Sequence, residues 1–474
     1  KSHYNINFCY KYKVVVLIEQ KSLKFQKLAK NTRLIALEIW ILIFYKNKNF
    51  EKTIDNSFDF NKLDKRDKSF VYLLINSSMR RHKQAQRIYT KYAKQGIDPR
   101  NRYLNSILLI ATVQLIWLEI APYAVINEAV YQAKLFISEK QSRLVNAILR
   151  KINQTKTEFS HIISNEASNL PEWLFNSWKS LYGKKNVDEI VKLAMDPPPL
   201  DIVISTKITK IEKETIKSEL NGVEIFPNVL RCPFNGNVED LPRFKDGIWW
   251  IQDAASQIPC SILLTKIKKN FLKSIQSLKI IDMCCAPGVK TAQLLDNDLV
   301  IDCIEKNKAR SRIFKKNMAR LNFNPNLFNV NAEDFNPEYK ADVILIDAPC
   351  SGTGTIRKNP DIFIRNAPNN LDNFVSIQNK ILDNSAKILK KNGLIMYVTC
   401  SLQKIEGERR IEDFLKSHKQ FSIVCFNSED YPKINDSITK EGFIRILPNH
   451  FNFNFENVSN GSDGFFIALL KKEK

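Results

Sequence analysis

Residues 342–351 read Asp-Val-Ile-Leu-Ile-Asp-Ala-Pro-Cys-Ser, a short apolar run between acids that predicts a buried strand ending in reactive side chains. A second run, residues 393–401 (Gly-Leu-Ile-Met-Tyr-Val-Thr-Cys-Ser), has the same form and also ends at a cysteine. Apolar strands that alternate with helices favour a parallel sheet, which binds ligands outside the carboxyl ends of its strands. We therefore expect Cys350 and Cys400 to face one crevice.

The chain has 474 residues, which is too long for one ordinary hydrophobic core, so we expect two or three domains. Its 72 lysines and arginines against 50 aspartates and glutamates give a formal net charge of +22. Such a surplus commonly neutralises a polyanion such as nucleic acid. The alternative is a lysine-rich proteome, since Lys, Asn and Ile dominate throughout the sequence, and the charge by itself does not name the partner.

The nine cysteines show neither Cys-x-x-Cys nor Cys/His spacing, which argues against a zinc site and against a disulfide framework. We therefore expect no metal, and a reducing cytoplasm as the location. The longest apolar region, 106–126, has the length of a membrane span but contains Gln114, Glu119 and Pro122, which predicts a buried helix broken near the proline. The apolar run 35–45 is too short to span a membrane, and no cleavage site follows it.

The hydrophobic pattern divides the chain into four segments. Residues 1–50 are helix-forming sequence to which we assign no function. Residues 51–165 repeat apolar side chains at helical spacing, which predicts an all-α bundle that ends in a polar linker. Residues 166–245 contain a proline triplet followed by strands and a helix, as expected of a small α+β connecting domain. Residues 246–474 are expected to form the catalytic domain.

The predicted bundle has two groups of basic residues. They are Arg80, Arg81, His82 and Lys83, and later Arg143 and Arg150. A basic surface on a small helical domain suits contacts with phosphates, although a solvated face explains the same pattern.

A strand, a glycine-containing turn and a helix follow one another between residues 278 and 295. The free N–H groups and the dipole of a helix start favour a nucleotide-like ligand, so this turn predicts a cofactor cradle. The next strand, 299–304, ends in Glu305, whose carboxylate can accept hydrogen bonds from both ribose hydroxyls. The acidic tip after the following strand offers Asn331 or Asp334 to an adenine edge, or is a plain polar loop. The alternation of strands and helices predicts a Rossmann-like α/β domain.

This order of strands resembles an S-adenosylmethionine-dependent methyltransferase. Enzymes of this class that methylate amino groups usually carry Asp or Asn, two prolines and an aromatic residue after the fourth strand, where this chain has Asp347-Ala348-Pro349-Cys350. A cysteine there suits carbon methylation, because C5 of cytosine is a poor nucleophile until a thiolate adds to C6. An acid near N3 of the ring assists by holding its proton.

Segments 347–354 (Asp-Ala-Pro-Cys-Ser-Gly-Thr-Gly) and 399–401 (Thr-Cys-Ser) resemble the RNA cytosine-C5 methyltransferases of the RsmB/Nop2/Sun family. Segments 146–150, 252–254, 357–361 and 463–466 are also similar to that family. The helical segment resembles the NusB-type RNA-binding bundle of the RsmB (Sun) branch, which methylates 16S ribosomal RNA. The resemblance implies S-adenosyl-L-methionine as the cofactor, small-subunit ribosomal RNA as the partner, and neither a membrane nor a metal. We expect a monomeric, cytoplasmic enzyme.

The resemblance, transferred position by position, makes Cys400 the nucleophile that attacks C6 and Cys350 the residue that helps release the product. In DNA cytosine methyltransferases, the cysteine after the proline is instead the nucleophile. We expect Lys290 or the bound sulfonium to favour the thiolate of Cys400, and Asp347 to contact both the cofactor and the target base. The cofactor residues that the resemblance implies are Cys284, Cys285, Ala286, Pro287, Gly288, Val289, Lys290, Glu305, Asn331, Asp334 and Asp347.

The chain departs from the family pattern at several positions. Val289 follows Gly288 where a second glycine is usual, so the turn must use an ordinary backbone conformation there or bind the cofactor less closely. Asn331 and Glu305 stand where aspartate is common. The strand predicted at 201–205 lacks the arginine often seen in the connecting domain, which puts one RNA contact in doubt.

Two other functions compete with this interpretation. The first is an RNA-binding assembly factor that keeps the fold but has lost methyl transfer through the altered turn. The second is methylation of transfer RNA by the same chemistry. Cofactor binding separates the first from the main hypothesis, and mapping of the methylated nucleotide separates the second.

Overall fold

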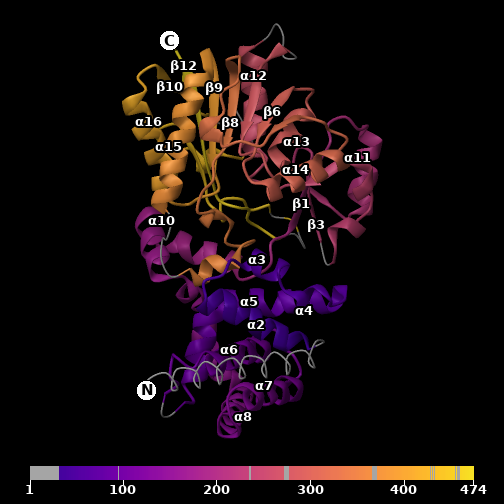
Figure 1. The fold of residues 1–474 in the computed structure, drawn as a ribbon, viewed down its shortest axis with the longest axis vertical. Helices are drawn as coiled ribbons and strands as arrows, with labels where there is room; N and C mark the ends of the chain where they lie inside the picture. Colours follow the sequence, from indigo (N-terminus) through magenta and orange to yellow (C-terminus); the bar gives the residue numbers. More distant parts are fainter. Residues whose placement is uncertain are drawn as a thin grey trace, which may run out of the picture. The chain divides into compact units, whose positions relative to one another are not determined.

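The structure is a computed structural model that describes residues 31–473, apart from 94–95, 234–235, 272–276, 366–370, 428, 430, 432, 454 and 456–458. The chain divides into two compact units, Lys1–Leu170 and Pro171–Lys474. Figure 1 shows helices throughout the first unit and two sheets with their helices in the second.

The first unit is helical wherever the structure describes it. Its α-helices are α2 (Thr32–Tyr45), α3 (Phe50–Asp55), α4 (Phe58–Asn61), α5 (Lys65–Thr90), α6 (Arg102–Ile116), α7 (Pro122–Phe136), α8 (Glu139–Gln154) and α9 (Ser160–Ile163). Most begin at an Asn, Ser or Asp whose side chain accepts hydrogen bonds from the first free N–H groups. The predicted all-α bundle is therefore confirmed.

The apolar region 106–126 contains the end of one helix and the start of another. Helix α6 ends at Ile116, and Pro122 occupies the first turn of α7, where its missing N–H costs nothing. The predicted break near Pro122 is confirmed. Among the residues that the structure describes, no helix is long and apolar enough to cross a membrane.

Helix α2 lies within the segment 1–50, for which the sequence suggested no role. It buries seven residues, including Trp40 and Ile43, and packs against α5 and α6. The bundle therefore begins before residue 51. Residues 1–30, the rest of that segment, lie outside the described residues.

The basic run 80–83 does not form the surface that the sequence predicted. Arg80 and His82 are buried, and burial lowers the pKa of His82 to about 4. Arg81 pairs with Glu166 at 3.4 Å, and Lys83 donates to the carbonyl of Leu170. These side chains hold α5 to the end of the unit, because a charge that leaves water needs a partner. Arg143 and Arg150, on α8, are exposed as expected.

The second unit opens with α10 (Glu172–Ala194), which is interrupted at Gly183, and a four-stranded antiparallel sheet in the order β2-β3-β1-β4. The elements of this sheet are β1 (Leu200–Ile204), α11 (Lys210–Glu219), β2 (Val223–Phe226), β3 (Val229–Cys232) and β4 (Trp249–Ile251). The small α+β region is confirmed. Its fourth strand, β4, follows the boundary that the sequence suggested at residue 245.

The other sheet has eight strands in the order β10-β12-β9-β8-β5-β6-β7, with β11 paired to β12. The strands are β5 (Ile280–Met283), β6 (Ile301–Ile304), β7 (Asn326–Phe328), β8 (Ala341–Asp347), β9 (Leu389–Thr399), β10 (Phe421–Ile423), β11 (Ile444–Ile446) and β12 (Phe465–Lys472). The five strands from β9 to β7 are parallel, whereas β12 runs antiparallel to β9. The predicted Rossmann-like α/β fold is confirmed.

Successive strands are added first on one side of the central strand β5 and then on its other side. From β5 it continues through β6 to the edge at β7, and it then places β8 on the opposite side of β5, with β9 beyond. The strand order therefore reverses between β5 and β8, which is where open α/β sheets bind their ligands.

Helices cover both faces of the parallel strands (Figure 1). Helices α12 (Ile258–Asn270), α13 (Val289–Leu295) and α14 (Lys308–Arg320) share one core with alternate strand residues such as Ile280 and Val343. Helices α15 (Leu371–Ile388) and α16 (Glu408–Ser417) share the other core with Ile281 and Ile344. Burial on both faces explains why the strands read as continuous apolar runs.

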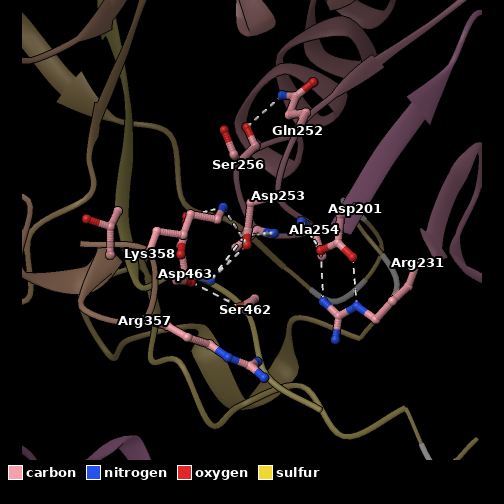
Figure 2. Close-up of polar contacts among 12 residues, drawn as sticks. Asp201, Arg231, Gln252, Asp253, Ala254, Ser256, Arg357, Lys358, Ser462 and Asp463 are labelled. Carbon is pink, nitrogen blue, oxygen red and sulfur yellow. Dashed lines mark hydrogen bonds and ion pairs between the residues drawn. The ribbon is translucent and has the colours of Figure 1, made fainter. Parts of the chain in front are cut away.

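A network of charged residues, in which the carboxylates are largely buried and Lys358 is partly exposed, ties the small sheet to the loop before β12. Figure 2 shows Lys358 between two carboxylates, those of Asp463 at 2.7 Å and Asp253 at 3.1 Å. The N–H of Asp463 also donates to Asp253, and Arg357 donates to the carbonyl of Asn460 at 2.8 Å. These contacts fix the loop that leads into Phe465.

Arg231 and Asp201 form a second part of this network (Figure 2). They face each other on β3 and β1, and the guanidinium meets the carboxylate through two hydrogen bonds of 2.7 and 2.8 Å. Arg231 also donates to the carbonyl of Ser459. The segment 201–205 has no arginine of its own, but its neighbour β3 supplies one to the same sheet.

We expect Arg231→Met to lower the free energy of unfolding of the second unit by about 3–5 kcal/mol, because Asp201 would remain charged and buried without its cation. Urea unfolding followed by tryptophan fluorescence measures this. The control is Lys213→Met, which removes a more exposed pair with Glu224 and should cost less than about 1 kcal/mol. Equal losses in the two variants would show that other contacts satisfy Asp201.

Candidate active site

Two thiols meet where β8 and β9 end. Cys350 follows β8 by three residues, and Cys400 follows β9 directly. Their Sγ atoms lie 3.5 Å apart, and both side chains are partly exposed. A cysteine pair at this distance can share one proton, which leaves one sulfur available as a nucleophile.

Backbone hydrogen bonds hold the two cysteine loops against each other. The N–H of Gly354 donates to the carbonyl of Cys400 at 2.9 Å, and the N–H of Leu402 donates to the hydroxyl of Thr353 at 3.0 Å. Gly354 has no room for a side chain, because a Cβ there would overlap the carbonyl of Gly464 and lie 2.9 Å from that of Cys400. The thiols are therefore placed by backbone contacts at close range.

Lys290 and Asp347 form an ion pair beside the thiols, at the reversal between β5 and β8. The Nζ atom donates to Oδ2 at 2.8 Å, with the lysine side chain 6% exposed and the aspartate side chain 31% exposed. Burial opposes the charge of Lys290, but attraction to Asp347 outweighs it and raises the pKa of the amine, with smaller contributions from Cys260 and Cys400. The ring of Phe465 lies 5.3 Å from Nζ. The site thus has a permanent cation near Cys400.

The turn after β5 is compact, and hydrogen bonds connect it to the end of β6 and to α14. Cys284 has φ 63°, the Ala286–Pro287 peptide is cis, and the N–H of Cys285 donates to the carbonyl of Ile304. The carbonyl of Ala286 accepts from Arg310, and that of Pro287 accepts from Asn317. The side chains of Cys285 and Ala286 are buried in the core, so these two residues offer a ligand their backbone alone.

Only Gly288, and not Val289, has the backbone conformation in this turn that requires glycine. Gly288 has φ 107°, and a Cβ there would meet Met318 at 2.7 Å, so the position requires glycine. Val289 begins α13 in an ordinary helical conformation. The valine therefore does not strain the turn, which removes the objection raised by the missing second glycine.

Glu305, directly after β6, has the properties expected of a ribose ligand. Its side chain is 3% exposed, and Oε1 accepts the N–H of Asn307 at 2.8 Å. The other oxygen, Oε2, is buried and accepts no hydrogen bond, although Nη1 of Arg310 lies 3.3 Å away. A buried carboxylate oxygen without a donor is costly, and a ligand hydroxyl would satisfy it. The residues present thus fit a nucleoside cofactor.

The acidic tip after β7 lies beside this carboxylate through the pairing of β6 with β7. Asn331 and Asp334 are exposed, and the amide of Asn331 donates to the Asp334 carboxylate at 2.7 Å. Asn329, which the sequence did not single out, donates to the backbone carbonyl of Glu305 at 3.0 Å. Both predicted tip residues can be approached from solvent at the edge of the cradle.

Asp282, inside β5, is a further buried acid that the sequence analysis passed over. Its Oδ2 accepts the hydroxyl of Thr291 at 2.6 Å, whereas Oδ1 has no hydrogen-bond partner. Burial raises the pKa of this carboxyl to about 7. Asp282 and Thr291 therefore join β5 to α13 behind the turn.

Arg310 and Glu406 also contact this site, although the sequence did not single them out. Arg310 links the turn to Glu305, and Glu406 contacts both cysteine loops. An acid within six residues of Thr-Cys-Ser was a usable signal for Glu406. For Arg310 no local signal existed, because α14 contains several basic residues of equal appearance. No group of three or more metal-binding side chains is arranged to hold an ion among the described residues.

Two family models match the chain. The one described as NusB family matches residues 30–154, and the one described as 16S rRNA methyltransferase RsmB/F matches residues 270–471. The chain is also similar to the probable ribosomal RNA small subunit methyltransferase B of Synechocystis sp., with 27% identity over 441 residues, 88% of this chain and 94% of that protein. The corresponding protein of Bacillus subtilis is 26% identical over 395 residues, 78% of this chain and 83% of its own.

Solved structures share the fold. The crystal structure of PH0851 has a TM-score of 0.67 at 22% identity and covers 92% of this chain and 97% of its own. NSun6 from Pyrococcus horikoshii, solved with the S-adenosylmethionine analogue SFG, has a TM-score of 0.53 at 21% identity. It covers 65% of this chain and 99% of its own.

We expect Asp282→Asn to change how stability depends on pH. The pKa of Asp282 is raised from 3.8 to about 7 by folding, so only the unfolded chain ionises between these values, and stability falls as pH rises through that range. Asparagine does not ionise, so it removes this loss. The free energy of unfolding of the variant, relative to that of the parent, should therefore increase as the pH rises from about 5 to about 8. Chemical unfolding at both pH values measures the difference. The exposed control Asp372→Asn should show no such trend. If the free energy of unfolding of Asp282→Asn had the same pH dependence as that of the parent, the raised pKa of Asp282 would be contradicted.

Proposed function

Because the chain belongs to the RsmB/F family of 16S rRNA methyltransferases, with a NusB-family domain before its S-adenosyl-L-methionine-dependent catalytic domain, we propose that it methylates C5 of a cytidine in small-subunit ribosomal RNA. The observation that carries this proposal is the pair of thiols 3.5 Å apart beside Lys290 and Asp347. Methylation of nitrogen or oxygen needs no thiol, whereas C5 must first be activated by addition at C6.

Cys400 acts as the nucleophile in this proposal. The pKa of Cys350 is raised well above its ordinary value by its hydrogen bond to Cys400 and by burial, so the shared proton stays on Cys350. The hydrogen bond then runs from Cys350 to the Cys400 sulfur, and the cation of Lys290 is close enough to favour a negative charge there. Attack by this sulfur on C6 moves electron density to C5.

Cys350 acts in the release step. S-adenosyl-L-methionine, when bound, supplies the methyl group, and C5 then carries both the methyl group and a proton that must leave. Once Cys400 is bonded to carbon, its hydrogen bond and its charge no longer raise the pKa of Cys350. Cys350, whose side chain is partly exposed, can then give its proton to solvent, and its thiolate accepts the proton from C5. The electrons of the C5–H bond form the C5–C6 double bond, and the bond from C6 to Cys400 breaks with return of its electrons to sulfur.

Asp347 and Glu305 orient the two substrates in this proposal. Asp347 is partly exposed while it accepts from Lys290, so its other oxygen can hold the edge of the cytosine ring. Glu305 and the turn 284–290 hold the cofactor, with Asn331 and Asp334 at its outer edge. The valine after Gly288 does not argue for a chain that has lost its cofactor, because it adopts an ordinary helical conformation.

Ribosomal RNA is the proposed partner of both units. Arg143 and Arg150 project from α8, and the chain carries a net charge of +22. Basic side chains that neutralise phosphates release counterions and bind RNA without reading its sequence. Recognition of the target cytidine then falls to the site in the second unit.

We expect Glu305→Ala to weaken S-adenosyl-L-methionine binding by roughly 1–3 kcal/mol, because the ribose hydroxyls would lose their buried acceptor. Isothermal titration calorimetry measures the affinity. Glu338→Ala, which removes an exposed acid elsewhere in the same domain, is the control and should bind as the parent does. Equal affinities in the two variants would remove Glu305 from the cofactor site.

The two thiols should give opposite results when replaced. Cys400→Ala should form no covalent complex with RNA, whereas Cys350→Ala should accumulate a protein–RNA adduct that survives denaturing electrophoresis, because the C5 proton cannot leave. With the parent enzyme, nucleoside analysis of 16S rRNA should show 5-methylcytidine. An adduct with Cys400→Ala and none with Cys350→Ala would reverse the two roles, and a methyl group on another atom would refute the proposed chemistry.

A further inference from the structure

A single buried carboxylate, that of Glu406, lies behind both cysteine loops. The residue ends a short helical turn (Lys404–Glu406) after β9, and its side chain is 0% exposed. Oε1 accepts the backbone N–H of Ser351 at 2.8 Å and the amide of Gln378 at 3.3 Å. Oε2 accepts the hydroxyls of Ser351 and Ser401, each at 2.5 Å. Neither of the roles proposed above for the site uses this acid.

The partners of Glu406 are the residues that directly follow the two thiols. Ser351 comes after Cys350, and Ser401 comes after Cys400. The two serine hydroxyls also lie 3.1 Å from each other, and the hydroxyl of Ser401 accepts the N–H of Gln403. One carboxylate therefore connects the two loops at the positions nearest the reacting sulfurs.

We propose that Glu406 is a positioning residue that holds Cys350 and Cys400 at their working separation. This inference rests on the proposed function, in which one thiol attacks and the other takes part in release. A displacement of about 1 Å at a reacting group lowers catalysis on the order of 10²-fold. The hydrogen bonds from Gly354 to Cys400 and from Leu402 to Thr353 hold the two loops together, and Glu406 adds a connection, shielded from water, at the residues that directly follow the thiols.

The charge of Glu406 has a second effect that an uncharged connector would lack. Its negative charge adds to the hydrogen bond between Cys350 and Cys400 and to burial in raising the pKa of Cys350. A negative group beside the release thiol disfavours its ionisation, so Glu406 helps to keep the negative charge of the thiol pair on Cys400 before attack. The connector thus also supports the different roles of the two thiols.

A purely structural role for Glu406 is the alternative. The backbone carbonyl of Glu406 accepts the hydroxyl of Tyr397, and its neighbour Glu408 pairs with Arg445, so the turn has anchors that do not use the Glu406 carboxylate. Removing the carboxylate should therefore leave the turn in place while it frees the two serine residues. This separation makes the role of the side chain testable.

The first measurement follows the geometry and does not involve RNA. Diamide takes two electrons and two protons from a pair of thiols and joins them as a disulfide, and only thiols in contact react quickly. We expect Glu406→Ala to slow formation of the Cys350–Cys400 disulfide on the order of tenfold, as followed by peptide mapping after alkylation of the remaining cysteines. The control Glu412→Ala, on the exposed side of α16, should react as the parent does.

The second measurement follows the reaction. Glu406→Ala should lower kcat on the order of 10²-fold with little change in KM for S-adenosyl-L-methionine, because the cofactor cradle is intact. Glu406→Gln keeps the shape but not the charge, so it should retain more activity and move the acid limb of the pH–kcat profile to lower pH. If Glu406→Ala does not fold, Ser351→Ala and Ser401→Ala each remove one connection and should slow the disulfide reaction.

Each result decides whether Glu406 positions the two thiols or has a purely structural role. An unchanged disulfide rate in folded Glu406→Ala, or in both serine variants if Glu406→Ala does not fold, overturns the inference, and so does a parent-like kcat in Glu406→Ala. If the parent enzyme methylates no cytidine while Glu406→Ala still slows the disulfide reaction, the proposed function fails and the positioning of the thiols by Glu406 stands.

Discussion

The parallel pairing of β5 with β8 is the constraint on which the whole site depends. The chain runs outward from β5 in one direction and returns to add β8 and β9 in the other, so the strand order reverses between β5 and β8, the point at which such sheets bind ligands. Lys290 reaches this point from the first turn of α13, and Asp347 ends β8. Their ion pair lies at this point, with the cysteines after β8 and β9 on one side of it in the strand order and Glu305, after β6, on the other.

Much of this arrangement could be predicted because buried parallel strands are recognisable from local sequence. The run 342–347 and the run that ends at Cys400 lie on β8 and β9, and Glu305 directly follows β6 as expected. These residues are adjacent to apolar runs, so their position at a strand end follows from the pattern itself. The break at Pro122 follows from the same kind of local rule.

Polar residues whose partners lie far away in the sequence could not be predicted in this way. The run 80–83 looked like a surface, yet Arg80 and His82 are buried, and Arg81 and Lys83 are half-buried and pair with Glu166 and Leu170. Arg231 matters because Asp201 faces it on another strand, and Glu406 matters because two serines converge on it. A sequence pattern shows that a residue is charged, but tertiary packing decides whether that charge is solvated or paired.

The last strand in chain order, β12, has a consequence for how the enzyme is made. It pairs with β9 in the middle of the sheet, Gly464 donates to the carbonyl of Gly354, and the ring of Phe465 lies against Lys290. A ribosome delivers these residues after every other strand of the domain has left the exit tunnel, since synthesis proceeds from the amino terminus. The parallel strands can therefore pair before β12 is available, and the contacts of Gly464 and Phe465 form only after β12 has left the exit tunnel and paired with β9.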